Sequence, residues 1–332
     1  MKKFLLLSLL VLTIVTLSAC QTAPTYDIVT TNYVQYDFAR TIVGDKLRVG
    51  MVLKPGVEAH GYEPTPQNII TINKAKLFFY TSDIMEPWAK SSIETSNTLT
   101  IVVDMSTLVD VEAIDHHHDH EEVSTSSSSM KPTKLGVGDD DDHHDTDPHY
   151  WVDLIVAMQM VDIILEKIIS IDPDNAAFYT QNAEELHHEI EELHEEIEHY
   201  FEHIDESNRV IFHAGHVNLA YFAARYHMSV VSLTEEYAPD GQPTAPQIIQ
   251  MITRIEQSGH QVLFFEELSN PQVAQTIKTE LASRNYTITL LLFHGLHNVS
   301  QAEFNAKVTY LSIMNQNFTN LKIALDPYKA VE

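Results

Sequence analysis

The chain has 332 residues, with 47 acidic side chains against 20 Lys and Arg and a formal net charge of −27. Hydrophobic residues make up 44% of the chain, which is enough for a folded core and excludes wholesale disorder. The negative charge argues against nucleic acid as a partner, because no basic surface can dominate. A single Cys excludes an internal disulfide framework, whereas the 19 His need an explanation.

The N-terminus has the pattern of a secretory signal. Two Lys follow Met1, residues 4–15 are almost entirely apolar, and Leu17-Ser18-Ala19-Cys20 comes next. The apolar run is too short to span a membrane, and the four-residue run resembles the bacterial lipoprotein box. We expect 1–19 to be a lipoprotein signal peptide and a lipidated Cys20 to hold the protein on the extracytoplasmic face of the cell membrane. The alternative is an ordinary secretory signal with a chance Cys.

The first half of the mature chain alternates between β-rich and helical segments. Short runs of buried character are separated by segments with helical periodicity. This pattern predicts strands over 28–31, 47–53, 77–80 and 98–103, and helices over 34–42, 66–74 and 150–170.

A long helix is predicted over 174–205, because apolar residues recur at alternating spacings of four and three and form one stripe. Strands and helices alternate again after it. Strands are expected over 209–212, 230–231, 262–265 and 286–293, and helices over 217–226, 245–258, 271–284 and 304–325. The sequence therefore predicts an α/β fold of two lobes, 20–173 and 206–332, joined by the rigid helix 174–205.

Acidic and imidazole side chains fill residues 115–147, which contain almost no apolar residues. Such a segment cannot bury a core, so we interpret it as a mobile loop of the N-terminal lobe. Its His residues could capture metal ions loosely, although a solvated polar loop is the alternative. These are His116, His117, His118, His120, His143 and His144.

Five His of the long helix lie among Glu residues: His187, His188, His194, His199 and His203. Most of them point away from the apolar stripe, and we interpret these as part of a solvated face. His194 and His199 are five residues apart, so they do not form the H-E-x-x-H pattern of zinc proteases.

Four further His stand at the ends of predicted elements: His60, His149, His216 and His297. Two come from each lobe, and ligands of open α/β sheets collect beyond the carboxyl ends of the strands. Four converging imidazoles would form a closed tetrahedral site, which suits Zn²⁺.

At these residues the chain resembles the solute-binding lipoproteins of metal ABC importers, and most of all the zinc members of the ZnuA/AdcA type. The segment from Glu58 to Pro66 resembles the motif of the first metal ligand, and Asp147-Pro148-His149-Tyr150-Trp151 resembles the second. Further similarity lies in Glu86-Pro87-Trp88 and in 310–317. The acidic loop precedes the second motif, where zinc members carry theirs.

The third motif of the family has a Tyr five residues after the His and an Arg-Tyr pair further on. Counting from His216 gives Tyr221 and Arg225-Tyr226, so His216 is favoured over His213. The fourth family ligand is usually a carboxylate, but this chain has His294-Gly295-Leu296-His297 there. His297 is therefore the expected ligand, with His294 as the alternative, and an all-nitrogen set favours Zn²⁺ over Mn²⁺.

The resemblance implies a monomeric protein, not an enzyme, that captures extracellular Zn²⁺ and hands it to an ABC permease and its ATPase. One alternative is an extracellular zinc hydrolase with an open metal position and Glu63 or Glu266 as general base. Another is a zinc-buffering adhesin, active in cell adhesion and without a permease.

Overall fold

The computed structural model describes residues 25–94, 99–111, 147–234, 243–268 and 271–328. The predicted signal peptide with Cys20 and nearly all of the predicted loop, including its six His, lie outside these residues. None of the helices within the described ranges combines the length and the apolar character that crossing a membrane requires.

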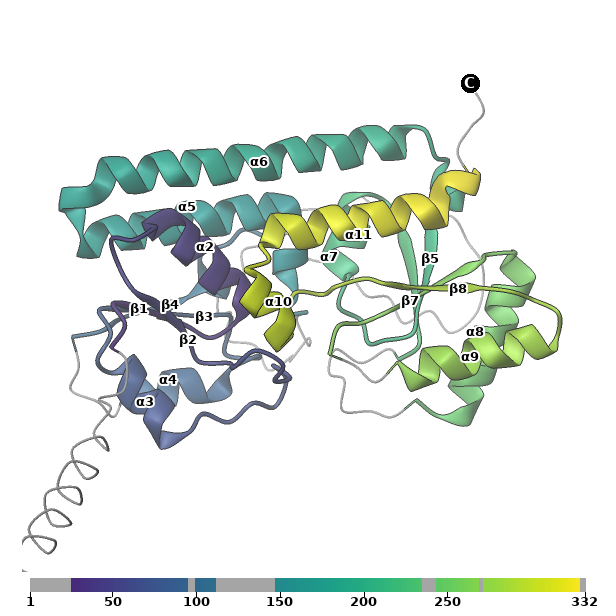
Figure 1. Cartoon of the computed structure of the whole chain (residues 1–332), viewed down its shortest axis with the longest axis horizontal. Helices are drawn as coiled ribbons and strands as arrows, with labels where there is room; N and C mark the ends of the chain where they lie inside the picture. Colours follow the sequence, from purple (N-terminus) through teal and green to yellow (C-terminus); the bar gives the residue numbers. More distant parts are fainter. Residues whose placement is uncertain (1–24, 95–98, 112–146, 235–242, 269–270, 329–332) are drawn as a thin grey trace, which may run out of the picture.

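Two parallel four-stranded sheets form the frame of the molecule (Figure 1). The N-terminal sheet has the order β2-β1-β3-β4 and the C-terminal sheet the order β6-β5-β7-β8. Because all pairings are parallel, the carboxyl ends of the strands in each sheet lie at one edge. The strands are β1 (Ile28–Thr30), β2 (Val49–Met51), β3 (Leu77–Tyr80), β4 (Ile101–Asp104), β5 (Val210–His213), β6 (Ser229–Ser232), β7 (Val262–Phe265) and β8 (Thr289–Leu292).

The two-lobe α/β fold that the sequence predicts is confirmed.

Helices connect the strands, and local capping signals set the bounds of these helices. The helices are α2 (Tyr33–Val43), α3 (Pro66–Ile72), α4 (Pro87–Glu94), α5 (Leu154–Ile171), α6 (Ala176–Glu202), α7 (Ala220–Arg225), α8 (Ala245–Ser258), α9 (Gln272–Ser283), α10 (Gln301–Ala306) and α11 (Tyr310–Leu325).

Several element predictions are wrong in detail. The last predicted helix, 304–325, is two helices, because Lys307 adopts a left-handed conformation with φ 56° and Thr309 caps a new helix at Tyr310. The helix expected from 150 begins with a 3₁₀ turn over Tyr150–Val152, and α5 starts only after Asp153, which accepts a hydrogen bond from the backbone of Ile155. Helix α4 was not predicted.

Helix α6 runs along both lobes on one side of the molecule and packs against α5, α2 and α11 (Figure 1). Its predicted apolar stripe is buried, for example at Ile190 and Ile197. One apolar core cluster includes residues of both sheets as well as α5, α6 and α11. The two lobes are therefore joined by shared packing and not by a flexible linker.

Polar contacts also tie the lobes together beneath α6. The backbone N–H of Tyr310 donates to Oδ2 of Asp37 over 2.7 Å, and the guanidinium of Arg40 donates to the carbonyl of Val308 over 2.7 Å. Asp37 is buried, so its pairing with Arg40 satisfies a charge that would otherwise be costly to bury. These contacts fix the position of one lobe against the other.

Candidate metal centre

The four His that the sequence places at element ends lie together where the lobes meet. Their ligand nitrogens all lie within 4.8 Å of one another. The six distances between their ring centroids span only 4.8 to 5.3 Å. Four points at nearly equal mutual distances form a tetrahedron, which is the geometry of a four-coordinate zinc site. The four are His60, His149, His216 and His297.

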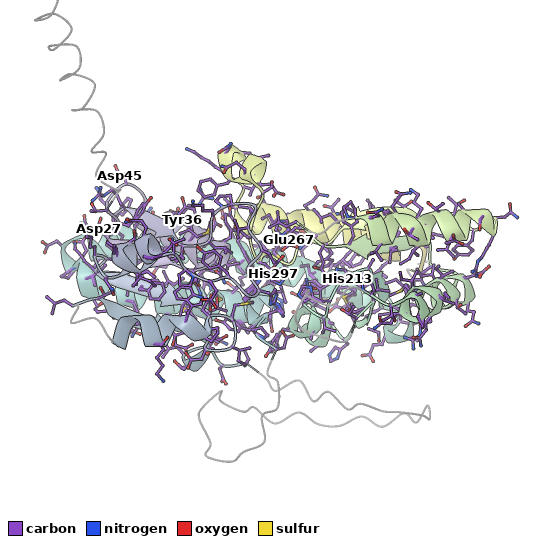
Figure 2. All side chains as sticks on the ribbon, turned by 90° about the horizontal axis from the view of Figure 1, so that it is seen from below. Asp27, Tyr36, Asp45, His213, Glu267 and His297 are labelled. Atoms are coloured by element: carbon purple, nitrogen blue, oxygen red, sulfur yellow. The ribbon has the colours of Figure 1, made fainter. Side chains whose placement is uncertain are left out.

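Each lobe contributes two of these rings. His60 lies in the segment between β2 and α3, and His149 directly precedes the 3₁₀ turn that leads into α5. His216 follows β5 and His297 follows β8, at the carboxyl edge of the C-terminal sheet. Figure 2 shows His297 and Glu267 in the middle of the molecule. The site is thus positioned by the strand ends of one sheet and by two loops of the other lobe.

Three of the rings are oriented by buried carboxylates. Nδ1 of His149 lies 2.6 Å from Oδ1 of Asp147, and Nδ1 of His216 lies 2.9 Å from Oε1 of Glu266. Nδ1 of His297 lies 2.9 Å from Oε1 of Glu267. An Nδ1–H that donates to a carboxylate leaves the lone pair on Nε2, the arrangement that metal-binding imidazoles require.

The Nε2 atoms that result are available to a ligand. Those of His216 and His297 are buried and have no hydrogen-bond partner among the described residues. The Nε2 atoms of His60 and His149 lie 3.2 Å apart. Buried nitrogens without partners are costly, so the Nε2 atoms of His216 and His297 mark a place that could hold a cation.

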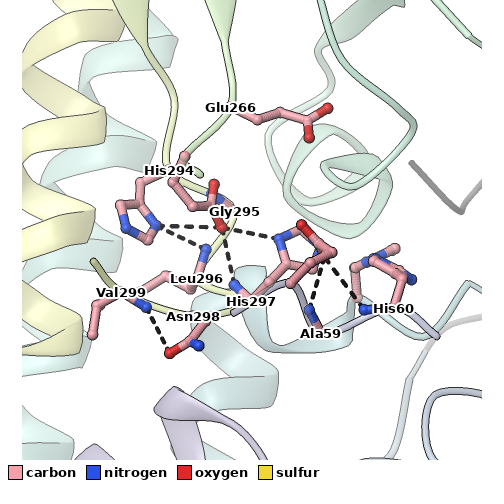
Figure 3. A network of polar contacts seen from close by, with 12 residues as sticks. Ala59, His60, Glu266, His294, Gly295, Leu296, His297, Asn298 and Val299 are labelled. Carbon is pink, nitrogen blue, oxygen red and sulfur yellow. Dashed lines mark hydrogen bonds and ion pairs between the residues drawn. The ribbon is translucent and has the colours of Figure 1, made fainter. Parts of the chain in front are cut away.

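Glu267 organises the loop that carries His297. One carboxylate oxygen accepts from the backbone N–H of Gly295 over 2.7 Å, and the other accepts from the backbone N–H of His297 over 3.1 Å. Figure 3 shows this network together with His60 and His294. The carboxylate therefore fixes both the ring and the main chain of the same residue.

Two glycines allow this close approach. A Cβ on Gly215 would lie 1.6 Å from Oε1 of Glu266, which is the oxygen that pairs with His216. A Cβ on Gly295 would lie 2.7 Å from the amide of Asn218 and 2.8 Å from the ring of His297. Any larger side chain at either position would displace a group of the site.

The pKa shifts differ in direction among the His residues of the cluster. Burial, followed by the neighbouring imidazoles, lowers the pKa of His60 and of His149, so both rings are neutral near pH 7. Burial also opposes the charge on His297, but the hydrogen bond and the negative charge of Glu267 outweigh it and raise the pKa of His297. Despite its burial, Glu267 has a lowered pKa because of His294 and His297.

The alternative ligands lie outside this group. His213 ends β5, is fully buried, and neither ring nitrogen has a hydrogen-bond partner among the described residues. Nδ1 of His294 accepts from the backbone N–H of Leu296 over 3.0 Å, and Nδ1 also lies 3.6 Å from Oε1 of Glu267. Neither ring belongs to the cluster of converging nitrogens.

Sequence reasoning missed the three carboxylates as partners of the rings. Asp147 stands two residues before His149, and this short spacing was the available signal. Glu266 and Glu267 directly follow β7, which lies between β5 and β8 in the sheet. Their position at the same sheet edge as His216 and His297 could have indicated the pairing. The sequence suggests Glu266 only as the general base of a hydrolase.

The family described as zinc-uptake complex component A, periplasmic, matches residues 28–324. The high-affinity zinc uptake system protein ZnuA of Bacillus subtilis (strain 168) is 30% identical over 300 residues, covering 90% of this chain and 87% of the relative. The zinc-binding protein AdcA of Streptococcus pyogenes is 26% identical over 309 residues, which are 90% of this chain but only 56% of AdcA. The metal-dependent lipoprotein YcdH from Bacillus subtilis superposes with a TM-score of 0.70 at 26% identity, covering 90% of this chain and 98% of YcdH.

Proposed function

Because the chain belongs to the family of the periplasmic component A of zinc-uptake complexes, we propose that it captures Zn²⁺ outside the cytoplasm and delivers it to an ABC-type permease. The observation that carries this proposal is the near-tetrahedral set of four imidazoles between the lobes. Their rings come from distant parts of the chain and converge on one point, as capture of a single ion requires.

The proposed ligands are Nε2 of His60, His149, His216 and His297, with Asp147, Glu266 and Glu267 holding three of the rings. Four nitrogen donors favour Zn²⁺, whereas Mn²⁺ prefers oxygen. The three carboxylates place negative charge behind the imidazoles and so offset the charge of the ion. His213 and His294 are not part of this ligand set.

The metal content of the purified chain tests the ligand set. The six loop His are first replaced by Ser, so that only the His of the described residues can bind the ion. Elemental analysis after dialysis is expected to give one tightly held Zn²⁺ per chain, and none after joint substitution of His60→Ala and His149→Ala. The matched control is His187→Ala with His188→Ala, which removes two imidazoles from α6. Retention of the ion by the first pair would contradict the proposal.

The permease and its ATPase are proposed as partners on the basis of family membership. Deletion of the gene is expected to slow growth when zinc is chelated, and added Zn²⁺ should restore growth. If the protein is instead a zinc-buffering adhesin without a permease, deletion of its gene would leave zinc accumulation by the cells unchanged. Measurement of ⁶⁵Zn uptake in the deletion strain therefore separates the two functions.

We propose that the protein is not an enzyme. A zinc hydrolase needs an open coordination position for water, and four imidazoles occupy all four positions of a tetrahedral zinc ion. Hydrolysis of ester or peptide substrates by the zinc-loaded chain, lost on His297→Ala, would contradict this.

We also propose that the mature chain is a monomer with the lobes 20–173 and 206–332 and the linking helix 174–205, and that Cys20 carries a lipid anchor after removal of 1–19. Cys20→Ala should release the protein from the membrane fraction.

A further inference from the structure

The outer face of α6 carries an excess of metal-binding side chains that the cluster between the lobes does not use. Residues 183–206 contain 11 acidic residues and no Lys or Arg. Helix α6 packs against α5, α2 and α11 (Figure 1). Its apolar side is buried there, so the Glu and most of the His lie on the opposite side.

One pair of His on this face has the sequence spacing and the proximity that two imidazoles need to bind one ion. His199 and His203 are four residues apart, and their ring centroids lie 5.0 Å apart. Glu202 lies between them in sequence, and its Oε2 is 3.1 Å from Nδ1 of His199. Residues four apart share one face of a helix, and two His at this spacing are the metal-binding unit of H-E-x-x-H helices. His203 is the C-cap residue, and the two rings nevertheless remain adjacent.

The remaining His of α6 do not pair in this way. His194 is buried, and its Nδ1 lies 2.9 Å from the hydroxyl of Tyr226. His187 and His188 are neighbours in sequence, so their side chains leave the helix in different directions. Nε2 of His188 is 3.4 Å from Oε1 of Glu192. Among these five residues, the pair of imidazoles suited to chelation is therefore His199 with His203.

The local electrostatics favour a cation at this pair. It lies at the C-terminal end of α6, where residues 195–206 contain six acidic residues and no Lys or Arg. The nearby cation Arg209 donates to the backbone carbonyls of Phe201 and Ile204 over 2.8 and 3.0 Å and packs over the Phe201 ring. Phe201 belongs to the buried side of the helix. Arg209 therefore does not neutralise the acidic outer face, which carries His199.

We propose that His199 and His203, assisted by the carboxylate of Glu202, form a second binding site for a divalent transition-metal ion that prefers imidazole nitrogen, such as Zn²⁺. Water completes the coordination of the ion, because the side chains of His199 and Glu202 are 72% and 70% exposed. Two protein nitrogens hold an ion less tightly than four, so the site exchanges metal readily with the solution. This site does not depend on the function proposed above.

Equilibrium dialysis against Zn²⁺ tests the site. The full chain with its six loop His replaced by Ser is first loaded with one equivalent of Zn²⁺, and uptake of further Zn²⁺ is then measured. We expect a second equivalent to bind and to be lost completely in the variant His199→Ala, His203→Ala. The control variant His187→Ala, His188→Ala removes the same number of imidazoles from the same helix and should keep the second equivalent.

Nuclear magnetic resonance of ¹⁵N-labelled imidazoles identifies the residues independently of stoichiometry. Addition of the second equivalent should shift the ring resonances of His199 and His203 and leave those of His187 unchanged. The inference is overturned if the parent chain takes up no second equivalent, or if the His199→Ala, His203→Ala variant retains it. The variant His60→Ala, His149→Ala should lose the first equivalent of Zn²⁺ and keep the second, so it distinguishes the two sites.

Discussion

Nδ1 of His149 lies 2.6 Å from Oδ1 of Asp147, and both side chains are buried. Oδ1 of Asp147 also accepts from the backbone N–H of His149 over 2.9 Å. One carboxylate oxygen thus fixes the ring and the main chain of a proposed ligand. Similar pairs orient His216 and His297. The ring of His60 has no hydrogen bond to a carboxylate among the described residues, and it is also the least buried of the four rings.

Asp147→Asn should weaken zinc binding by about 10- to 100-fold, the usual effect of losing a carboxylate partner of a ligating His. The amide removes the negative charge that favours the Nδ1–H tautomer, while its size is unchanged. Competition titration with a zinc-chelating dye measures the change. Asp45→Asn is the matched control, because that side chain is 90% exposed. Equal affinities for both variants would contradict the assigned role.

His297→Asp should lower the preference for Zn²⁺ over Mn²⁺ by at least about tenfold, because an oxygen donor replaces one of four nitrogens. His297→Ala should weaken the binding of both ions, since it supplies no fourth donor. Parallel titrations with the two metals give the ratio for each variant. An unchanged ratio in His297→Asp would show that His297 does not set the metal preference.

Zinc affinity should fall as the pH is lowered. Ligand imidazoles must be neutral, and Glu267 raises the pKa of His297, so protons compete with zinc for this ring more strongly as the pH falls. The pKa values of His60 and His149 are lowered, so these rings release no proton near neutral pH. We therefore expect zinc binding to release protons, and to release more of them as the pH is lowered. Calorimetry in buffers of different ionisation enthalpy counts the protons, and a number that does not increase at lower pH would refute this account.

Glu86 should make the free energy of unfolding depend on pH. Burial raises its pKa to about 7, although it accepts hydrogen bonds from Thr81 and Ser82. Between the unfolded pKa and about 7, the native state binds more protons than the unfolded state. Stability therefore falls as the pH rises through this range, by up to about 1.4 kcal/mol per pH unit.

Urea unfolding of the wild type and of Glu86→Gln between about pH 5 and 7.5 tests this sign. The variant lacks the titrating group, so its stability should decrease less with rising pH than that of the wild type. Glu63→Gln replaces an exposed carboxylate and should follow the wild type. Parallel curves for Glu86→Gln and the wild type would exclude Glu86 as the cause.

Local sequence patterns predicted most of the elements closely. The strands over 77–80 and 262–265 and the helix over 245–258 have the predicted bounds. Short apolar runs mark the two strands, and Pro246 at the start and Gly259 after the end mark the helix. The split between α10 and α11 was missed, since Lys307 in a left-handed turn has no sequence signal comparable to Gly.

The sequence by itself determined the alternation of strands and helices, the buried stripe of the long helix and the placement of four His at element ends, because each depends on neighbours within a few residues. Only the tertiary structure decided that the ring of His216, and not that of His213, enters the cluster, since residues three apart leave a strand end in different directions. It also decided the pairing of His216 with Glu266, 50 residues away. That contact exists because β5 and β7 are adjacent in the sheet, and strand order is set by the packing of the whole lobe.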